Sequence, residues 1–463
     1  MFLALGKLSN QSCEPLSLEK VDDKHSIEVT GDASTRHLSR ATTITAAIVI
    51  LLIYQGYSLS IAGVASPWIA KSFLLDQVNL ARMFAWMSVS AFGALIVTRL
   101  ADRIGRRRVI LSSLVLAPIA AAGAGIAPDL KSFLLLEIVI NALLSGSVSS
   151  ALVLLAEELP TAQRARGQAY AAFGSAVGGA LTYVTIPFLL GWGYSWRWLL
   201  APCVSGIALV VPLARMLPRE TRWSRLASTE SVSQSHFYDI FHPLYRRRAL
   251  ALLACASLDT IAGSAVNGWL YYDAVSIAGL SPRMASLLIV IGMVVGMLGF
   301  PVGAWTSNKF GRVPTVMYVG GAGWLGAWAF YWVPPLIRWA LIWLLAAYCW
   351  FKFTSGIMTV GANSAATELL PSGLRATMIG WQCITAAAFS MLAQFLVAFL
   401  IGPLGSLERV IRYLALLGIP SAFIFGLFID ETRGLPIEVA GKEEAWARVK
   451  IATVKTGHEL RAE

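Results

Sequence analysis

The sequence predicts an all-α integral membrane protein in which twelve transmembrane helices form two pseudo-symmetric six-helix bundles. Hydrophobic residues make up 57% of the chain and charged residues only 14%, whereas a soluble protein carries about 25% charged residues. Short charged loops separate long apolar runs, and one span needs about 20 predominantly apolar residues. The expected spans are 41–70, 83–99, 109–127, 131–155, 168–190, 196–216, 248–275, 284–305, 313–333, 338–366, 376–402 and 408–428.

Three short motifs occur twice, which predicts the division into two similar halves. The copies of the first two motifs stand 211 residues apart, and those of the third stand 206 apart. The pairs are 157–165 with 368–376, 220–222 with 431–433, and 102–106 with 308–312. Duplicated halves in an apolar background favour a binding site at the interface between the halves.

The placement of Lys and Arg predicts the orientation and the domain boundaries. Arginines gather in the loop 98–108 and in the central segment, whereas the opposite side holds single charges such as Lys71 and Lys131. Because loops rich in Lys and Arg stay inside, we expect both termini in the cytoplasm and the bundles in the plasma (inner) membrane. The predicted domains are a cytoplasmic, flexible N-terminal tail 1–40, a six-helix bundle 41–216, a cytoplasmic linker 217–247, a second bundle 248–428 and a cytoplasmic tail 429–463.

Charge and cysteine usage exclude several kinds of partner. The net charge of +11 fits contact with an anionic leaflet, and no nucleic acid is expected because the basic residues lie in separate short loops. The five cysteines are far apart without a CxxC pattern, so we expect neither disulfides nor a metal site. No nucleotide loop or nucleophile elbow occurs, so we expect no cofactor and no enzymatic activity.

Four of these motifs resemble those of a known family. The stretch 100–108, Leu-Ala-Asp-Arg-Ile-Gly-Arg-Arg-Arg, resembles the signature loop between helices 2 and 3 of the major facilitator superfamily. Segments 220–223 and 430–434 are similar to the motifs that end helices 6 and 12 in its sugar-porter branch. Segment 368–377 is similar to the helix 10–11 loop of sugar, organic-acid and organic-cation members. The resemblance implies the major facilitator fold and a sugar-porter-like or metabolite–proton symporter-like transporter.

The same resemblance leaves the coupling and the substrate open. Many proton-coupled organic-acid members carry Asp-Gly-x-Asp in helix 1, where this chain has Gln55-Gly56-Tyr57-Ser58. Sugar porters carry paired glutamines in helix 7, where Ile261 and an alanine stand here.

Charged residues at helix ends on the cytoplasmic side form the predicted gate. Carboxylates and guanidiniums at such positions can pair bidentately. By resemblance, one cluster in each half latches the halves together while the cavity opens outward, and breaks when it opens inward. The alternative is that these residues only hold the loops. The predicted gating residues are Asp102, Arg103, Arg106, Glu157, Arg164, Glu220, Arg222, Arg312, Glu368, Arg375, Glu431 and Arg433.

Polar stripes on four spans predict the substrate cavity. Polar groups cost free energy in lipid, so aligned ones indicate a cavity or a polar partner. The clearest stripe runs along span 338–366, and similar stripes lie on 248–275, 131–155 and 41–70. By resemblance, these first, fourth, seventh and tenth helices line the cavity. The predicted substrate-binding residues are Gln55, Asn141, Asn267, Tyr271, Tyr348, Lys352 and Asn363.

Lys352 is the most informative of these residues. It lies about 14 residues into its span, or roughly 21 Å from the outer end, where a charge indicates a functional site. We expect it to bind an anionic substrate, to form an ion pair with Asp259, or both. Asp259 and Glu137 are the predicted proton-coupling residues, although Glu137 could instead face the outer vestibule. Asp273 is expected to be solvated near the outer end.

These observations predict a secondary active transporter that moves a small solute by alternating access. The first choice is a proton-coupled symporter of an organic anion, a carboxylate. The alternative is a sugar or polyol facilitator or symporter, and a hypothesis of another class is a solute receptor or sensor without transport. The expected partners are the solute, protons and the lipid bilayer, and we expect a monomer.

Overall fold

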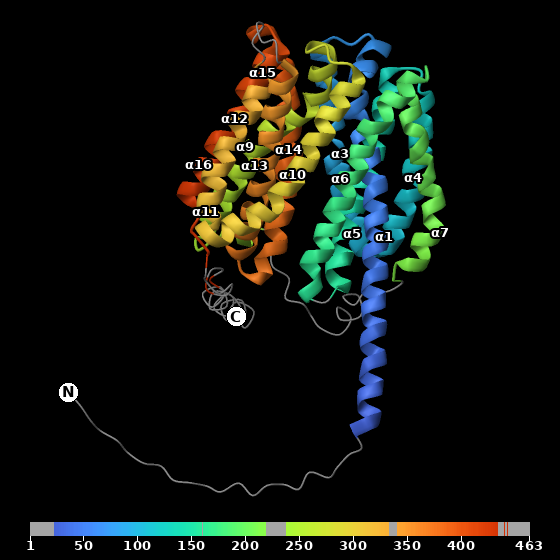
Figure 1. The fold of residues 1–463 in the computed structure, drawn as a ribbon, viewed down its shortest axis with the longest axis vertical. Helices are drawn as coiled ribbons and strands as arrows, with labels where there is room; N and C mark the ends of the chain where they lie inside the picture. The colour runs from blue at the N-terminus through green and yellow to red at the C-terminus, as the bar shows by residue number, and fades with distance from the viewer. Residues whose placement is uncertain are drawn as a thin grey trace, which may run out of the picture.

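The computed structural model describes residues 23–159, 161–218, 238–332 and 340–433, together with Val439 and Lys442. Within these ranges every regular element is a helix. Two helical bundles stand side by side, the first coloured blue to green and the second yellow-green to red (Figure 1). This arrangement confirms the predicted all-α fold with two bundles.

The first bundle has six membrane spans, two of which change their helix geometry on the way. It consists of α1 (Asp23–Ser72), α2 (Gln77–Met87), α3 (Ser90–Ile104), α4 (Arg106–Ile126), α5 (Leu130–Glu158), α6 (Thr161–Gly191), η1 (Trp196–Ser205) and α7 (Gly206–Met216). α2 and α3 together make one span, and the 3₁₀ helix η1 continues into α7 to make another.

The second bundle contains two π-helical turns, η3 and η4. It consists of η2 (Asp239–Phe241), α9 (Arg246–Tyr272), η3 (Asp273–Ile277), α10 (Pro282–Phe310), α11 (Arg312–Pro314), η4 (Thr315–Gly320), α12 (Gly321–Phe330), α13 (Ala340–Glu368), α14 (Ser372–Leu404), α15 (Leu407–Ala415) and α16 (Gly418–Phe428). π turns are rare and occur frequently at functional sites.

Eleven helical stretches in the described residues are long and apolar enough to cross a membrane. The remaining predicted span, 313–333, coincides with α11, η4 and α12, which follow one another without a loop. Because this stretch is rich in glycine and tryptophan, it is less apolar than the other spans. It nevertheless packs inside the second bundle, where Trp324 and Phe330 are buried.

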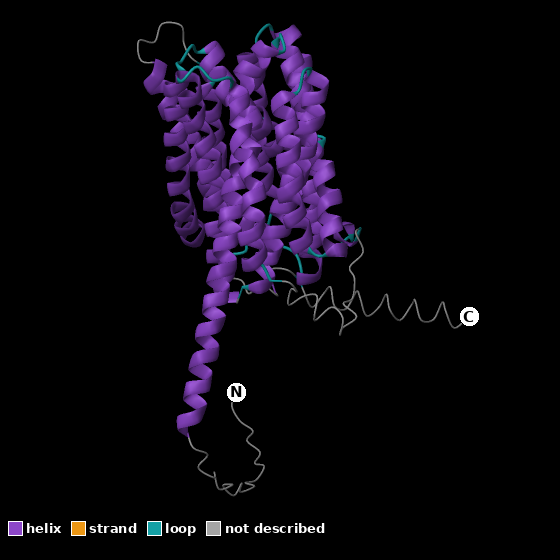
Figure 2. Cartoon of the chain, turned by 90° about the vertical axis from the view of Figure 1, so that its right-hand side faces the viewer, coloured by secondary structure: helices purple, strands orange, loops and turns teal. Residues whose placement is uncertain are grey.

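Parts of the predicted N-terminal tail and of the predicted linker have structure of their own. The tail was expected to be flexible up to residue 40, but α1 begins at Asp23 and extends beyond the bundles (Figures 1 and 2). The linker was expected over 217–247, but Ile240 and Tyr245 are fully buried against the second bundle. Apolar side chains explain this docking, since their burial removes them from water. Residues 219–237 of the linker lie outside the described part.

Helices within a bundle approach closely where glycine replaces a side chain. A Cβ on Gly178 of α6 would collide with the backbone of Ile53 in α1. A Cβ on Gly299 of α10 would likewise collide with the carbonyl of Phe353 in α13. Small residues permit such contacts, which is the usual basis of helix packing in membranes.

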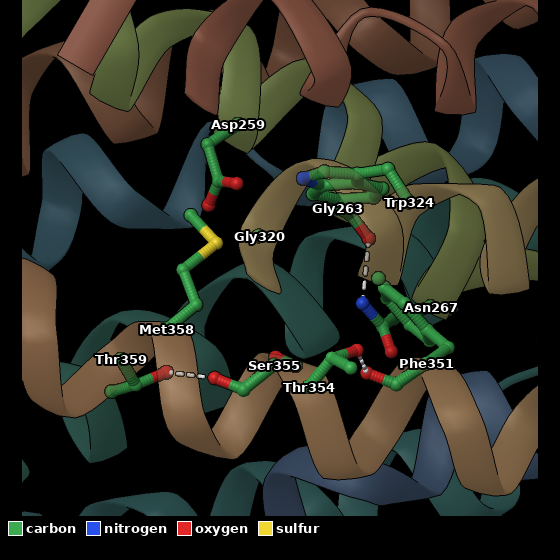
Figure 3. A pocket seen from close by; sticks show the side chains of 11 residues that line it. Asp259, Gly263, Asn267, Gly320, Trp324, Phe351, Thr354, Ser355, Met358 and Thr359 are labelled. Atoms are coloured by element: carbon green, nitrogen blue, oxygen red, sulfur yellow. Dashed lines mark hydrogen bonds between the residues drawn. The ribbon is translucent and has the colours of Figure 1, made fainter. Parts of the chain in front are cut away.

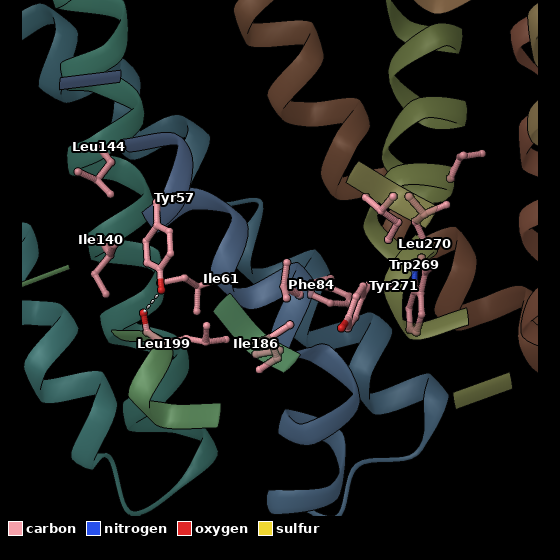
Figure 4. Close-up of a cluster of buried hydrophobic side chains, with 14 of the residues drawn as sticks. Tyr57, Ile61, Phe84, Ile140, Leu144, Ile186, Leu199, Trp269, Leu270 and Tyr271 are labelled. Carbon is pink, nitrogen blue, oxygen red and sulfur yellow. Dashed lines mark hydrogen bonds between the residues drawn. The ribbon is translucent and has the colours of Figure 1, made fainter. Parts of the chain in front are cut away.

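The two bundles meet through aromatic side chains at the end opposite the termini, which we call the far end. Phe84 of α2 packs edge-on against Trp269 of α9, with ring centroids 5.4 Å apart (Figure 4). Tyr271 of α9 packs against Trp68 of α1 and Tyr183 of α6, at 6.0 and 5.5 Å. These contacts close the far end between the bundles. We call the opposite end, where both termini lie, the terminal end.

Candidate substrate-binding site

A cavity of about 100 Å³ lies in the second bundle between α9, the η4–α12 segment and α13 (Figure 3). The π turn η4 ends at this cavity, because Gly320 is one of its lining residues. The lining residues are Asp259, Gly263, Asn267, Gly320, Gly323, Trp324, Phe351, Thr354, Ser355, Met358 and Thr359. Several come from the polar stripes that the sequence placed on the seventh and tenth spans.

Lys352 lies beside this cavity and bonds to Asn267 rather than to an acid. Its Nζ donates to Asn267 Oδ1 at 2.7 Å and lies 5.5 Å from the ring centroids of both Tyr348 and Phe351. The expected ion pair with Asp259 is absent. The reason is distance: Asp259 stands eight residues before Asn267 on α9, which is roughly 12 Å along the helix. The cation therefore has no carboxylate partner in the described part of the chain.

Asp259 occupies the other end of the cavity. Its Oδ1 is buried and has no hydrogen-bond partner among the described residues. Figure 3 shows its carboxylate directed toward Met358, with the ring of Trp324 nearby. An unsatisfied buried acceptor costs about 1–3 kcal/mol, so a ligand that donates a hydrogen bond there would be stabilised.

Three predicted binding residues lie away from this cavity. Tyr271 is buried at the far end, where its hydroxyl lies 3.1 Å from Ser286 Oγ. Tyr348 is also buried and packs against Gly292. Its ring lies near the Lys352 ammonium and does not line the cavity. Asn363 is exposed, farther along α13 toward the terminal end.

In the first bundle, Gln55 and Glu137 are buried and Asn141 is partly buried. Gln55 of α1 is 0% exposed, and neither of its amide atoms has a partner among the described residues. Asn141 Nδ2 donates to Glu137 Oε2 at 3.2 Å, and Glu137 is 3% exposed. Glu137 is therefore buried in this state, and both interpretations of its role stay open.

Asp273 also differs from expectation. It was expected to be solvated, but it is 2% exposed and its Oδ1 has no partner in the described residues. It begins the π turn η3, and the packing of this turn against the second bundle covers it. The sequence alone could not indicate this, because position along a span does not report which way a side chain points.

The two halves form equivalent ion pairs at the terminal end. Arg106 pairs with Glu157 in the first bundle, and both side chains are 15% exposed. Arg312 pairs with Glu368 in the second bundle, with Nη2 and Oε1 3.0 Å apart. Each pair joins the signature loop of one half to the end of a cavity-side helix, α5 or α13.

The second half adds further contacts to its pair. The carboxylate of Glu431 accepts hydrogen bonds from the backbone N–H groups of Arg312 and Val313, each at 3.0 Å. The hydroxyl of Thr432 donates to the second oxygen of Glu368. The chain that follows α16 is thus tied to the start of α11 and the end of α13.

The remaining predicted gating residues take other positions. Arg103 is exposed, Arg375 Nε donates to the carbonyl of Leu370 at 2.9 Å, and the backbone N–H of Arg433 donates to Glu431. Four ion pairs each join two residues of one bundle: Arg40–Glu158, Arg106–Glu157, Arg248–Asp430 and Arg312–Glu368. The residues outside the described part are Glu220 and Arg222, with the side chains of Asp102 and Arg164.

Sequence reasoning missed a polar connection between α9 and α14. Gln394 Nε2 donates to the carbonyl of Ser264 at 3.0 Å, and Gln394 Oε1 accepts from Trp269 Nε1 at 3.0 Å. Ser390 Oγ lies 2.9 Å from Ser264 Oγ. A glutamine inside an apolar span was the available signal. It links the cavity-lining helix α9 to the aromatic contacts that close the far end.

Comparison with known proteins points to one family. The model of the Major Facilitator Superfamily matches residues 46–394. A gentisate transporter of Corynebacterium glutamicum is 23% identical over 76% of this chain and 80% of its own length. A cis,cis-muconate transport protein of Acinetobacter baylyi is 26% identical over 72% of this chain and 80% of its own. The crystal structure of a D-xylose–proton symporter superposes with a TM-score of 0.66 at 19% identity, covering 85% of this chain and 99% of the symporter.

Proposed function

The chain belongs to the Major Facilitator Superfamily, and from that premise we propose that it moves a small organic carboxylate together with a proton. As a member of that family it is an integral membrane transporter that works by alternating access, and not an enzyme. The proposal concerns the transported solute, the coupling to protons and the orientation in the membrane. It rests above all on Lys352, the cation beside the cavity that has no carboxylate partner in the described part of the chain.

Lys352 supports an anionic cargo. A charge at the depth of the hydrocarbon core is costly and is retained where it serves a substrate or ion pathway. Its hydrogen bond to Asn267 leaves the other ammonium donors available to a carboxylate at the cavity edge. Two of the similar proteins are named for gentisate and cis,cis-muconate, which are both carboxylates.

Two buried acids are candidates for the proton. Asp259 faces the cavity, and Glu137 is buried in the first bundle beside Asn141. Each could be neutral in one state of the cycle and ionised in another, because burial without a cationic partner penalises the charged form. The positively charged loops favour the terminal end as cytoplasmic. The closed far end then corresponds to an inward-facing state of a monomer.

A sugar or polyol is the second candidate cargo. It is favoured by the structural likeness to the D-xylose–proton symporter and by the amide of Asn267 at the cavity. It leaves the charge of Lys352 without a substrate partner. A receptor without transport is the third hypothesis, and absence of uptake with retained ligand binding would favour it.

Uptake into proteoliposomes tests the proposal. Pooled carboxylates (benzoate, gentisate and cis,cis-muconate) are compared with pooled xylose, glucose and inositol, with and without an inwardly directed proton gradient. We expect uptake of carboxylates only, accelerated by the gradient. Sugar uptake that ignores the gradient would contradict the proposal and favour a facilitator.

A further inference from the structure

The cavity beside Lys352 has two polar ends and an apolar middle. At one end the Lys352 ammonium and the Asn267 amide lie together, 2.7 Å apart. At the other end Asp259 presents an oxygen without a partner. The ring of Trp324 lies between these ends, and that of Phe351 lies at the lysine end, 5.5 Å from Lys352 Nζ. The two ring centroids are 5.3 Å apart, with planes tilted by 47°. We call the two ends the lysine pole and the aspartate pole.

The rise of α9 gives the separation of the poles along the helix. Eight residues separate Asp259 from Asn267, roughly 12 Å at 1.5 Å per residue. A hydrogen bond of about 2.8 Å at each pole leaves roughly 5–7 Å between the two polar atoms of a ligand. A benzene ring places a carboxylate and a para substituent at about this separation.

The space between the poles is small. Its volume is about 100 Å³, below the roughly 150 Å³ of a cavity that holds one benzene molecule, so a ring carboxylate would extend out of it toward Lys352, which lies beside the cavity and does not line it. Trp324 is buried and wedged against Gly418, where a Cβ would collide with the indole ring. The indole face is therefore held in place as a surface for stacking, a contact that aromatic rings prefer in offset or tilted geometry.

At the aspartate pole Asp259 and Thr359 offer acceptors to a ligand, and the indole N–H of Trp324 is a donor that faces Asp259 (Figure 3). The Thr359 hydroxyl already donates to the carbonyl of Ser355 at 2.7 Å, so its remaining capacity is as an acceptor. The ionised carboxylate of Asp259 accepts only. Asp259 Oδ1 has no hydrogen-bond partner among the described residues, and a ligand group that lacks an O–H or N–H would leave it unsatisfied.

From this geometry we infer that the cavity selects ring carboxylates with an O–H or N–H donor opposite the carboxylate. Lys352 binds the carboxylate, the Trp324 face covers the ring, and Asp259 accepts the donor. The inference rests on the proposed carboxylate cargo and assigns its specificity to Asp259. A site that hydrogen-bonds a substrate donor rejects analogues that lack it, because its buried acceptor is then left unpaired.

Competition in proteoliposomes tests this assignment. Uptake of labelled 4-hydroxybenzoate is inhibited with unlabelled 4-hydroxybenzoate, 4-aminobenzoate, benzoate and 4-methoxybenzoate. In the natural protein the two compounds with a donor should inhibit at concentrations roughly 10- to 100-fold lower than the two without one. Because Asp259 is also a candidate proton carrier, Asp259→Ala is compared by equilibrium binding of the same four compounds to the purified protein, and there the preference should vanish.

Two further variants sharpen the result. Asp259→Asn keeps an acceptor and adds an N–H donor, so it should keep binding 4-hydroxybenzoate and gain affinity for 4-methoxybenzoate. Asp76→Asn is the control, because Asp76 caps α2 far from the cavity and asparagine caps a helix equally well. It should leave the order of affinities as in the natural protein.

The outcomes separate this inference from the proposed function. If carboxylates are transported but compounds with a donor have no advantage, the inference is wrong and the carboxylate proposal stands. The same holds if Asp259→Ala binds the four compounds and retains the preference. If no ring carboxylate is transported while a sugar is, the proposed function itself fails.

Discussion

The two halves share their ion pairs and their turn glycines at the terminal end, but they differ in how completely each pair is supported. Gly105 and Gly311 both adopt positive φ, at +99° and +109°, directly before the arginine of each pair. In the first half, Glu157 Oε2 is buried without a partner among the described residues. In the second half, the corresponding oxygen of Glu368 accepts from Thr432. Duplication thus kept the pair, while the surroundings of each copy diverged.

The same contrast holds inside the bundles. The second half forms a cavity with a cation at one pole and an acid at the other, whereas polar residues of the first half, such as Gln55 and Glu137, are buried. The second half therefore carries the features that could recognise a substrate. Four predictions test how far this difference extends.

Lys352→Gln should have the largest effect. Loss of one partner of a desolvated charge interaction costs about 2–5 kcal/mol, so the affinity for a carboxylate should fall by roughly 30-fold or more. The measurement is the concentration dependence of benzoate uptake. Lys131→Gln, an exposed lysine at the far end, serves as the control. Unchanged affinity in Lys352→Gln would remove the lysine pole from the site.

Glu368→Ala should destabilise the protein more than Glu157→Ala. The first change removes the partner of both Arg312 and Thr432, which should lower the free energy of unfolding by about 2–3 kcal/mol. The second removes the partner of Arg106 alone and should lower it by about 1–2 kcal/mol. The unfolding temperatures of the purified variants in one detergent measure the difference. Equal decreases would show that the extra support in the second half contributes nothing.

Gly311→Ala should likewise cost more than Gly105→Ala. Positive φ penalises any Cβ by about 1–2 kcal/mol, and that term is common to both positions. A Cβ on Gly311 would also lie 2.5 Å from Glu431 Oε2, whereas a Cβ on Gly105 meets nothing within 4 Å. The same unfolding assay compares the two. A larger loss for Gly105→Ala would contradict this account of the turns.

Gln55→Met should have the smallest effect on stability, with the opposite sign. Both amide atoms of Gln55 are buried and unsatisfied, so an apolar side chain of similar shape should stabilise the protein by about 1 kcal/mol. If Gln55 bonds to substrate in another state of the cycle, uptake should fall although stability rises. A variant that is more stable and fully active would mark Gln55 as a residue without a role in transport.

The sequence predicted the features that depend on residue type and spacing along one chain. Long apolar runs indicated the spans, since an exposed backbone in lipid must hydrogen-bond within its own helix. The repeated motifs placed an arginine and a glutamate at matching positions in both halves, and the structure pairs Arg106 with Glu157 and Arg312 with Glu368. A lysine deep in an apolar span stood out because its charge is costly there.

Only the tertiary structure decided which of these groups meet and which are covered. Helical periodicity placed Lys352 and Asp259 on stripes of facing helices, but the relative height of α9 and α13 brought Asn267 to the lysine instead. The packing of a π turn buried Asp273, and the closure of the far end covered Tyr271. Both outcomes depend on how separate helices dock, and the periodicity of a single helix carries no information about that docking.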